Sequence, residues 1–144
     1  MGKWQRVVVG VDGSESSRQA LEAAWEQARE HDAELVVVTT WSELPIAGAP
    51  GYGAYRWMGE ADFGAVAKQQ QDDALAAVVG ADSTVRIQRE VVEGHPAQQL
   101  LAAAEGADLL VVGSRGYGGF VGMLLGSVSQ HVAAHAPCPV LVIR

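Results

Sequence analysis

The chain is poor in cysteine, in basic residues and in long apolar runs, and each shortage excludes a class of function. Cys138 is the one cysteine among 144 residues, so no disulfide can form within the chain. Ten lysines and arginines stand against 17 acidic residues, and the net charge of −7 argues against nucleic acid or an anionic membrane as the main partner. No segment approaches the roughly 20 apolar residues of a membrane span, and the apolar run before Asp12 is too short for a signal peptide. We therefore expect one cytoplasmic domain over residues 1–144.

What the chain does contain is a regular alternation of short apolar runs and helical patterns. Runs rich in β-branched residues are typical of strands that are covered on both faces, and helical spacing fills the intervals between them. This β-α-β-α-β-α-β-α-β order predicts a single doubly wound α/β domain, a five-stranded parallel sheet with helices on both faces. The predicted strands are residues 6–11, 33–41, 84–92, 108–114 and 137–144.

The carboxyl ends of two strands carry the features that point to a ligand. In sheets of this kind ligands bind beyond those ends, where the strand order reverses. The first and fourth strands are the natural neighbours of that point. They end at Asp12 and at a glycine-rich segment, Gly113–Ser127, which leads into the last helix.

The glycine-rich segment matches neither of two familiar phosphate loops. A Walker A loop needs a lysine, and none follows Lys68; the dinucleotide fingerprint fails because the first strand is followed by "GVDGSE". The spacing is instead G-x2-G-x9-G-S, from Gly113 to Ser127. Its glycines allow close backbone approach to a sugar and phosphates, and the amides that open a helix favour negative charge. A ligand-free connector remains the alternative.

The same spacing, after a buried strand, resembles the ATP-binding motif of the universal stress protein family. The segments "VVVGVDGSESSRQALEAA" and "VVEGHPAQQLLAAAEGADLLVVGSRG" are similar to the family's N-terminal and central signatures, and Gly113–Arg144 resembles the C-terminal one. The resemblance covers almost the whole chain apart from Ser42–Gly59. It implies the strand order 3-2-1-4-5, ATP as the ligand, and a homodimer formed through the C-terminal strand.

The resemblance also implies a binding site, residue by residue. Asp12 would serve the ribose or a phosphate-bound Mg²⁺, although it is also explained as a cap or turn former before "GSES". Thr40 would hold the adenine through its backbone, with Val11 and Val112 as apolar neighbours. The ribose and inner phosphates would lie against Gly113, Arg115 and Gly116. The outer phosphates would lie against Gly126, Ser127, Val128 and Ser129.

The function that we predict is a nucleotide-dependent regulator of the stress response rather than an efficient catalyst. Phosphoryl transfer needs a positioned nucleophile and groups that stabilise charge. The predicted pocket offers Asp12 and Arg115 and no obvious base. A slow ATP hydrolase and a ligand-free dimeric interaction module remain alternatives, and the sequence does not reveal a downstream protein partner.

The other residues that attract attention have simpler explanations. His131 and His135 are four apart, as in zinc sites, but no third ligand is evident and the helix dipole explains a histidine in the last turn. His95 is interpreted as a helix-start residue and Cys138 as a packing residue. The loop Ser42–Gly59 is either a lid over the adenine or an insert.

Overall fold

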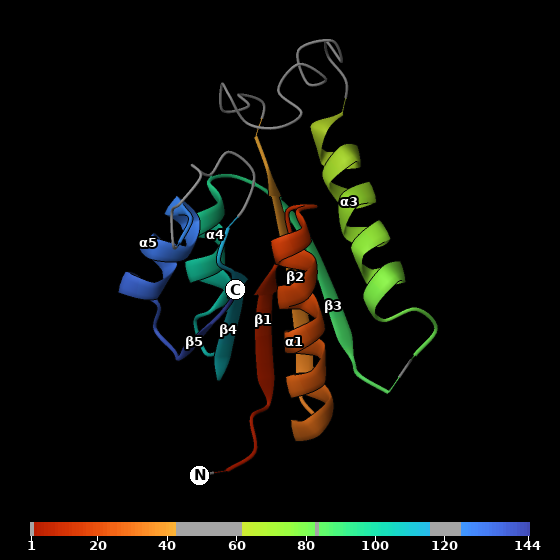
Figure 1. Ribbon diagram of the computed structural model, residues 1–144, viewed down its shortest axis with the longest axis vertical. Helices are drawn as coiled ribbons and strands as arrows, with labels where there is room; N and C mark the ends of the chain where they lie inside the picture. The colour runs from red at the N-terminus through yellow and green to blue at the C-terminus, as the bar shows by residue number, and fades with distance from the viewer. Residues whose placement is uncertain (1, 43–61, 83, 116–124) are drawn as a thin grey trace.

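The computed structural model describes residues 2–42, 62–82, 84–115 and 125–144. A five-stranded parallel sheet runs through the molecule in the order β3-β2-β1-β4-β5 (Figure 1). Helices α1 and α3 pack on one face of it, and α4 and α5 pack on the other. The predicted fold class and strand order are confirmed. The elements are β1 Arg6–Gly10, α1 Glu15–His31, β2 Glu34–Trp41, α3 Phe63–Val78, β3 Ile87–Glu93, α4 Pro96–Ala103, β4 Leu109–Gly113, α5 Ser127–His135 and β5 Val140–Ile143.

The three central strands carry the core because both of their faces are covered. In β1, Val7, Val8 and Val9 are fully buried; Val7 and Val9 face α1, and Val8 faces α4 and α5. This explains why the sequence of β1 shows no apolar–polar alternation. Among the described residues no helix is long and apolar enough to cross a membrane.

Two strand starts differ from the prediction by three residues, and both differences have a local cause. The third strand begins at Ile87 rather than Thr84, because the backbone N–H and the hydroxyl of Thr84 donate to Asp82 Oδ1, at 2.8 and 2.7 Å. The side chain thus forms a turn that competes with the sheet. The fifth strand begins at Val140, just after Pro139, which has no N–H to give to a ladder.

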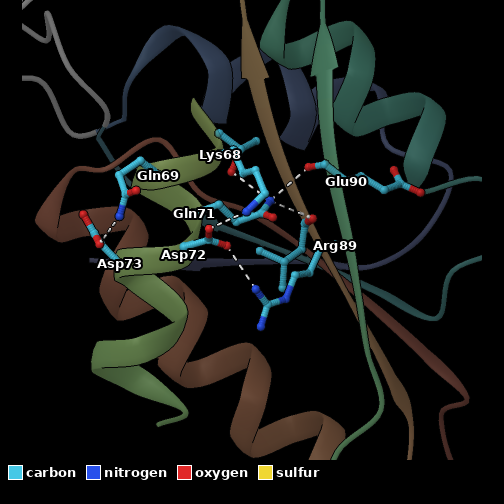
Figure 2. A network of polar contacts seen from close by, with 9 residues as sticks. Lys68, Gln69, Gln71, Asp72, Asp73, Arg89 and Glu90 are labelled. Carbon is cyan, nitrogen blue, oxygen red and sulfur yellow. Dashed lines mark hydrogen bonds and ion pairs between the residues drawn. The ribbon is translucent and has the colours of Figure 1, made fainter. Parts of the chain in front are cut away.

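A buried glutamine on α3 fastens this helix to the sheet, as Figure 2 shows. Gln71 is 1% exposed, and its Nε2 lies 3.2 Å from the Val37 carbonyl oxygen, 3.1 Å from Thr39 Oγ1 and 2.9 Å from the Glu90 carbonyl oxygen. One amide group therefore joins α3 to both β2 and β3.

An ion-pair network lies at the surface beside this glutamine. The Asp72 carboxylate lies 2.6 Å from Lys68 Nζ and 3.0 Å from Arg89 Nη1 (Figure 2). The hydrogen bond from Lys68 and the charge of Arg89 lower the pKa of Asp72. These charges are exposed to solvent, so the network contributes little stability compared with the buried amide.

Candidate functional site

The predicted site residues gather at the carboxyl edge of the sheet, which is the upper edge in Figure 1. β1 lies between β2 and β4, so the ends of these three strands are neighbours. Val11 follows β1 directly and its N–H donates to the Val38 carbonyl oxygen at 2.9 Å. Thr40 stands one residue before the end of β2, and Val112 and Gly113 end β4.

Gly116 and residues 43–59 of the predicted lid lie outside the described residues.

Hydrogen bonds join the two ends of the glycine-rich segment to each other. The Gly126 N–H donates to the Ser114 carbonyl oxygen at 2.6 Å, and the Ser129 hydroxyl donates to the Gly113 carbonyl oxygen at 2.5 Å. The Ser114 N–H donates to Ile143 at 2.7 Å, which joins the segment to β5. The Gly126 amide and the Ser129 hydroxyl, both expected to face phosphate, thus have protein acceptors in this structure.

The first turn of α5 differs from that of the other helices. Ser14, Asp62 and His95 each accept a hydrogen bond from the first turn of α1, α3 or α4 through a side chain, which confirms His95 as a helix-start residue. The N-cap of α5 is Gly126, which has no side chain to do this. The first amides of an α-helix have no partner within the helix, so those of Ser127, Val128 and Ser129 suit an acceptor from outside it.

Gly113 has a structural reason to be glycine that is independent of any ligand. A Cβ atom placed there would come nearest to the Ser16 Oγ, in the first turn of α1. It would also lie 2.7 Å from both the carbonyl carbon and the carbonyl oxygen of Ser16. The Ser16 Oγ also accepts a hydrogen bond from the Arg115 N–H at 3.2 Å. Ser16 is thus a residue of this edge that sequence reasoning missed. Its only signal was its place in the serine-rich turn "DGSESS".

Asp12 forms the turn that leads into α1. Its Oδ1 accepts from the Ser14 N–H at 2.9 Å and from the Ser14 hydroxyl at 2.5 Å, and the Ser14 Oγ in turn accepts from the Ser17 N–H at 3.2 Å. The turn-forming interpretation of Asp12 is confirmed. The side chain is exposed, so a ligand can still reach the carboxylate.

A pair of variants tests how Asp12 stabilises this turn. Asp12→Asn keeps an Oδ1 acceptor and should change the free energy of unfolding by less than about 0.5 kcal/mol, whereas Asp12→Ala should cost about 1 kcal/mol through the lost turn. Urea denaturation measures both values. If the asparagine variant is as unstable as the alanine variant, the charge rather than the acceptor geometry stabilises the turn.

The remaining candidates lie away from this edge. His131 and His135 are exposed on α5, and the described residues contain no group of three or more His, Cys, Asp or Glu that could hold a metal ion. Cys138 packs against the core on the α4–α5 face. Burial raises the pKa of the Cys138 thiol, and the charges of Asp108 and Glu105 raise it further, which makes a reactive thiolate unfavourable.

A polar hollow of about 610 Å³ lies at the opposite, amino-terminal end of the strands. Its lining carries both signs of charge, and the Asp108 carboxylate in it accepts from the backbone N–H groups of Gln5 and Arg6 at 2.7 and 3.0 Å. Parallel sheets bind ligands at the other edge, so the hollow is not the candidate site. The lining residues are Gln5, Arg6, Asp32, Glu34, Arg86, Gly106 and Asp108.

Comparison with known proteins identifies relatives over almost the whole chain. The model of the universal stress protein family matches residues 3–144. The chain belongs to the universal stress protein family. It is 40% identical, over 96% of its length, to a universal stress protein of Mycobacterium tuberculosis, and it spans 44% of that relative's length.

Solved structures of universal stress proteins share the whole fold. The protein UspA from Lactobacillus plantarum superposes with a TM-score of 0.80 at 24% identity, and each chain is covered over 100% of its length. A second universal stress protein, solved in complex with cAMP, is 32% identical with a TM-score of 0.66, over 99% of this chain and 98% of the other. A relative of this fold therefore binds an adenine nucleotide.

Proposed function

We propose that this universal stress protein binds ATP at the carboxyl edge of its sheet and acts as a nucleotide-dependent regulator of the stress response in the cytoplasm. The observation that carries the proposal is the first turn of α5. The N-cap of α5 is Gly126, which has no side chain to cap the helix. The Gly126 N–H donates to the Ser114 carbonyl oxygen, so α5 begins directly beside the point where the two ends of the glycine-rich segment are hydrogen-bonded to each other. The similar protein solved with cAMP supports an adenine nucleotide as the ligand class.

The proposed contacts use the amides that open α5 and the backbone at the ends of the strands. The amides of Ser127, Val128 and Ser129 hold the outer phosphates, since the helix dipole and three N–H groups favour negative charge there. Gly126, whose N–H donates to Ser114, lies beside the outer phosphates at the start of α5. Gly113, Arg115 and Gly116 form the backbone frame around the ribose and inner phosphates. Thr40 binds the adenine through its backbone, with Val11 and Val112 as apolar neighbours.

Magnesium fits this site only through the nucleotide. Asp12 is a single exposed carboxylate, and one of its oxygens already accepts two hydrogen bonds from Ser14. Mg²⁺ commonly keeps several waters and binds through one or two carboxylates plus substrate phosphates. We propose that Asp12 contributes its second oxygen to a phosphate-bound Mg²⁺ or to the ribose.

A pair of variants at Ser127 tests the amide contact without disturbing the fold. Ser127 is the first residue of α5, where proline is well tolerated, and Gly126 has φ −70° and ψ 165°, which a following proline allows. Ser127→Ala removes the hydroxyl, and Ser127→Pro removes both the hydroxyl and the N–H. We expect Ser127→Pro to bind ATP about tenfold more weakly than Ser127→Ala, with an unchanged melting temperature.

Calorimetric titration with Mg-ATP measures the difference between the two variants, and AMP provides the control. AMP lacks the outer phosphates, so its affinity should be nearly the same for both variants. Equal ATP affinity for Ser127→Ala and Ser127→Pro would contradict phosphate binding by this amide.

We also propose a homodimer that forms through β5. All four residues of this strand, Val140–Ile143, are apolar and only half-buried, and the sheet order leaves one of its edges without a neighbouring strand among the described residues. Apolar edges of this kind tend to pair. Sedimentation velocity should give twice the chain mass of 15.1 kDa. A monomer at every protein concentration would contradict this proposal.

A further inference from the structure

Two histidines on the outer surface of α5 have no part in the packing of the helix or in the proposed nucleotide site. His131 and His135 are both exposed, and their ring centroids lie 4.7 Å apart with the planes tilted by 44°. Residues four apart on a helix are neighbours on one face. The two imidazoles therefore stand side by side, while the neighbouring Val132 is fully buried and holds the helix against the sheet.

We propose that His131 and His135 chelate one divalent transition-metal ion, such as Zn²⁺, Ni²⁺ or Cu²⁺. Imidazole suits these ions, whereas Mg²⁺ and Ca²⁺ prefer oxygen ligands. Metal–nitrogen bonds of about 2.0–2.1 Å place two imidazole nitrogens about 3 Å apart on one ion. A small rotation of each side chain brings adjacent rings to that separation, and water completes the coordination.

The position of the pair on the helix favours a cation. His135 is the last residue of α5, and His131 lies one turn before it. The carboxyl end of a helix carries partial negative charge, and the chain as a whole has a net charge of −7. The absence of a third ligand among the described residues makes this an exchangeable surface site rather than a closed structural zinc site.

The test is a titration of tag-free, metal-stripped full-length protein with Ni²⁺ and Zn²⁺, read by calorimetry. We expect one ion per chain. His131→Ala or His135→Ala should each lower the affinity about tenfold or more, because an ion bound to one imidazole no longer has a second imidazole nearby at high effective concentration. The matched variant combines His135→Ala with Ala133→His, at an exposed position. It keeps the histidine count but moves the two imidazoles to different sides of the helix, so it should lose affinity equally.

A control at another histidine separates the site from general binding. His95→Asn keeps a side-chain acceptor at the N-cap of α4 and should leave metal affinity unchanged. Wild-type affinity in the Ala133→His, His135→Ala variant would overturn the proposal, because binding would then not depend on the spacing. Half an ion per chain would also overturn it, because the ion would then join two chains.

Discussion

Gly113→Ala is expected to lower the free energy of unfolding by about 2–3 kcal/mol, whether or not a nucleotide binds. The added methyl would lie 2.7 Å from the carbonyl carbon and oxygen of Ser16. These are backbone atoms in the first turn of α1, so they can move away only if the helix start shifts. That turn is itself held by the Asp12–Ser14–Ser17 hydrogen bonds.

Gly10→Ala is the matched control, because Gly10 ends β1 as Gly113 ends β4. A Cβ at Gly10 would meet the two terminal methyl groups of Leu100 at 3.0 and 3.1 Å, and a leucine side chain can adjust. We expect Gly10→Ala to cost less than Gly113→Ala in chemical denaturation. Adding Ser16→Ala to Gly113→Ala should restore little stability, because the backbone contacts remain. Full rescue by Ser16→Ala would show that only the hydroxyl obstructs the methyl group.

This result affects how binding experiments on Gly113 are interpreted. A loss of nucleotide binding in Gly113→Ala would follow from a displaced α1 as readily as from a lost ligand contact. Ser127 is the better position to change, since its substitution alters a donor and leaves the packing of β4 intact.

The second large effect is expected at Gln71. Gln71→Leu removes a buried donor from three oxygen acceptors and should cost about 2 kcal/mol. Gln71→Glu should cost more than about 3 kcal/mol at neutral pH, because an ionised carboxylate cannot donate and would face those oxygens in a site that is 1% exposed.

The pH dependence of Gln71→Glu has a definite sign. Burial would raise the pKa of the new carboxyl in the folded state above its value in the unfolded chain. The folded variant then binds more protons, so its deficit relative to wild type should shrink as the pH falls through the folded-state pKa. Urea denaturation at several pH values measures this. Gln69→Glu, on the exposed side of α3, should change stability by less than about 0.5 kcal/mol. A similar cost at both positions would contradict the role given to Gln71.

The sequence predicted the elements of this fold better than the contacts between them. Val7, Val8 and Val9 form an uninterrupted β-branched run, which is a local pattern, and they lie in the central strand. The strand order came from a family resemblance, because periodicity does not say which strands pair. The start of β3 was misplaced because the Asp82–Thr84 turn competes with strand formation.

The details of the candidate site depend on contacts between distant parts of the chain. Within the site, the Arg115 N–H donates to Ser16, 99 positions earlier in the chain. In the packing of α3 on the sheet, Gln71 donates to Val37, 34 positions earlier. No local pattern indicates such contacts. The sequence does not distinguish a glycine that makes room for a ligand from one that makes room for a neighbouring helix. The structural role of Gly113 was missed for this reason.

The most direct test of this account is calorimetric titration of nucleotide-stripped protein with Mg-ATP, ADP, AMP and cAMP. We predict one nucleotide per chain with micromolar affinity for ATP, and at least about tenfold weaker binding of AMP, because only ATP carries the outer phosphates that reach the amides of α5. Folded protein that binds none of the four at millimolar concentration would contradict the account and favour a ligand-free interaction module. Binding of AMP or cAMP as tight as that of ATP would contradict the proposal that the amides of α5 bind the outer phosphates.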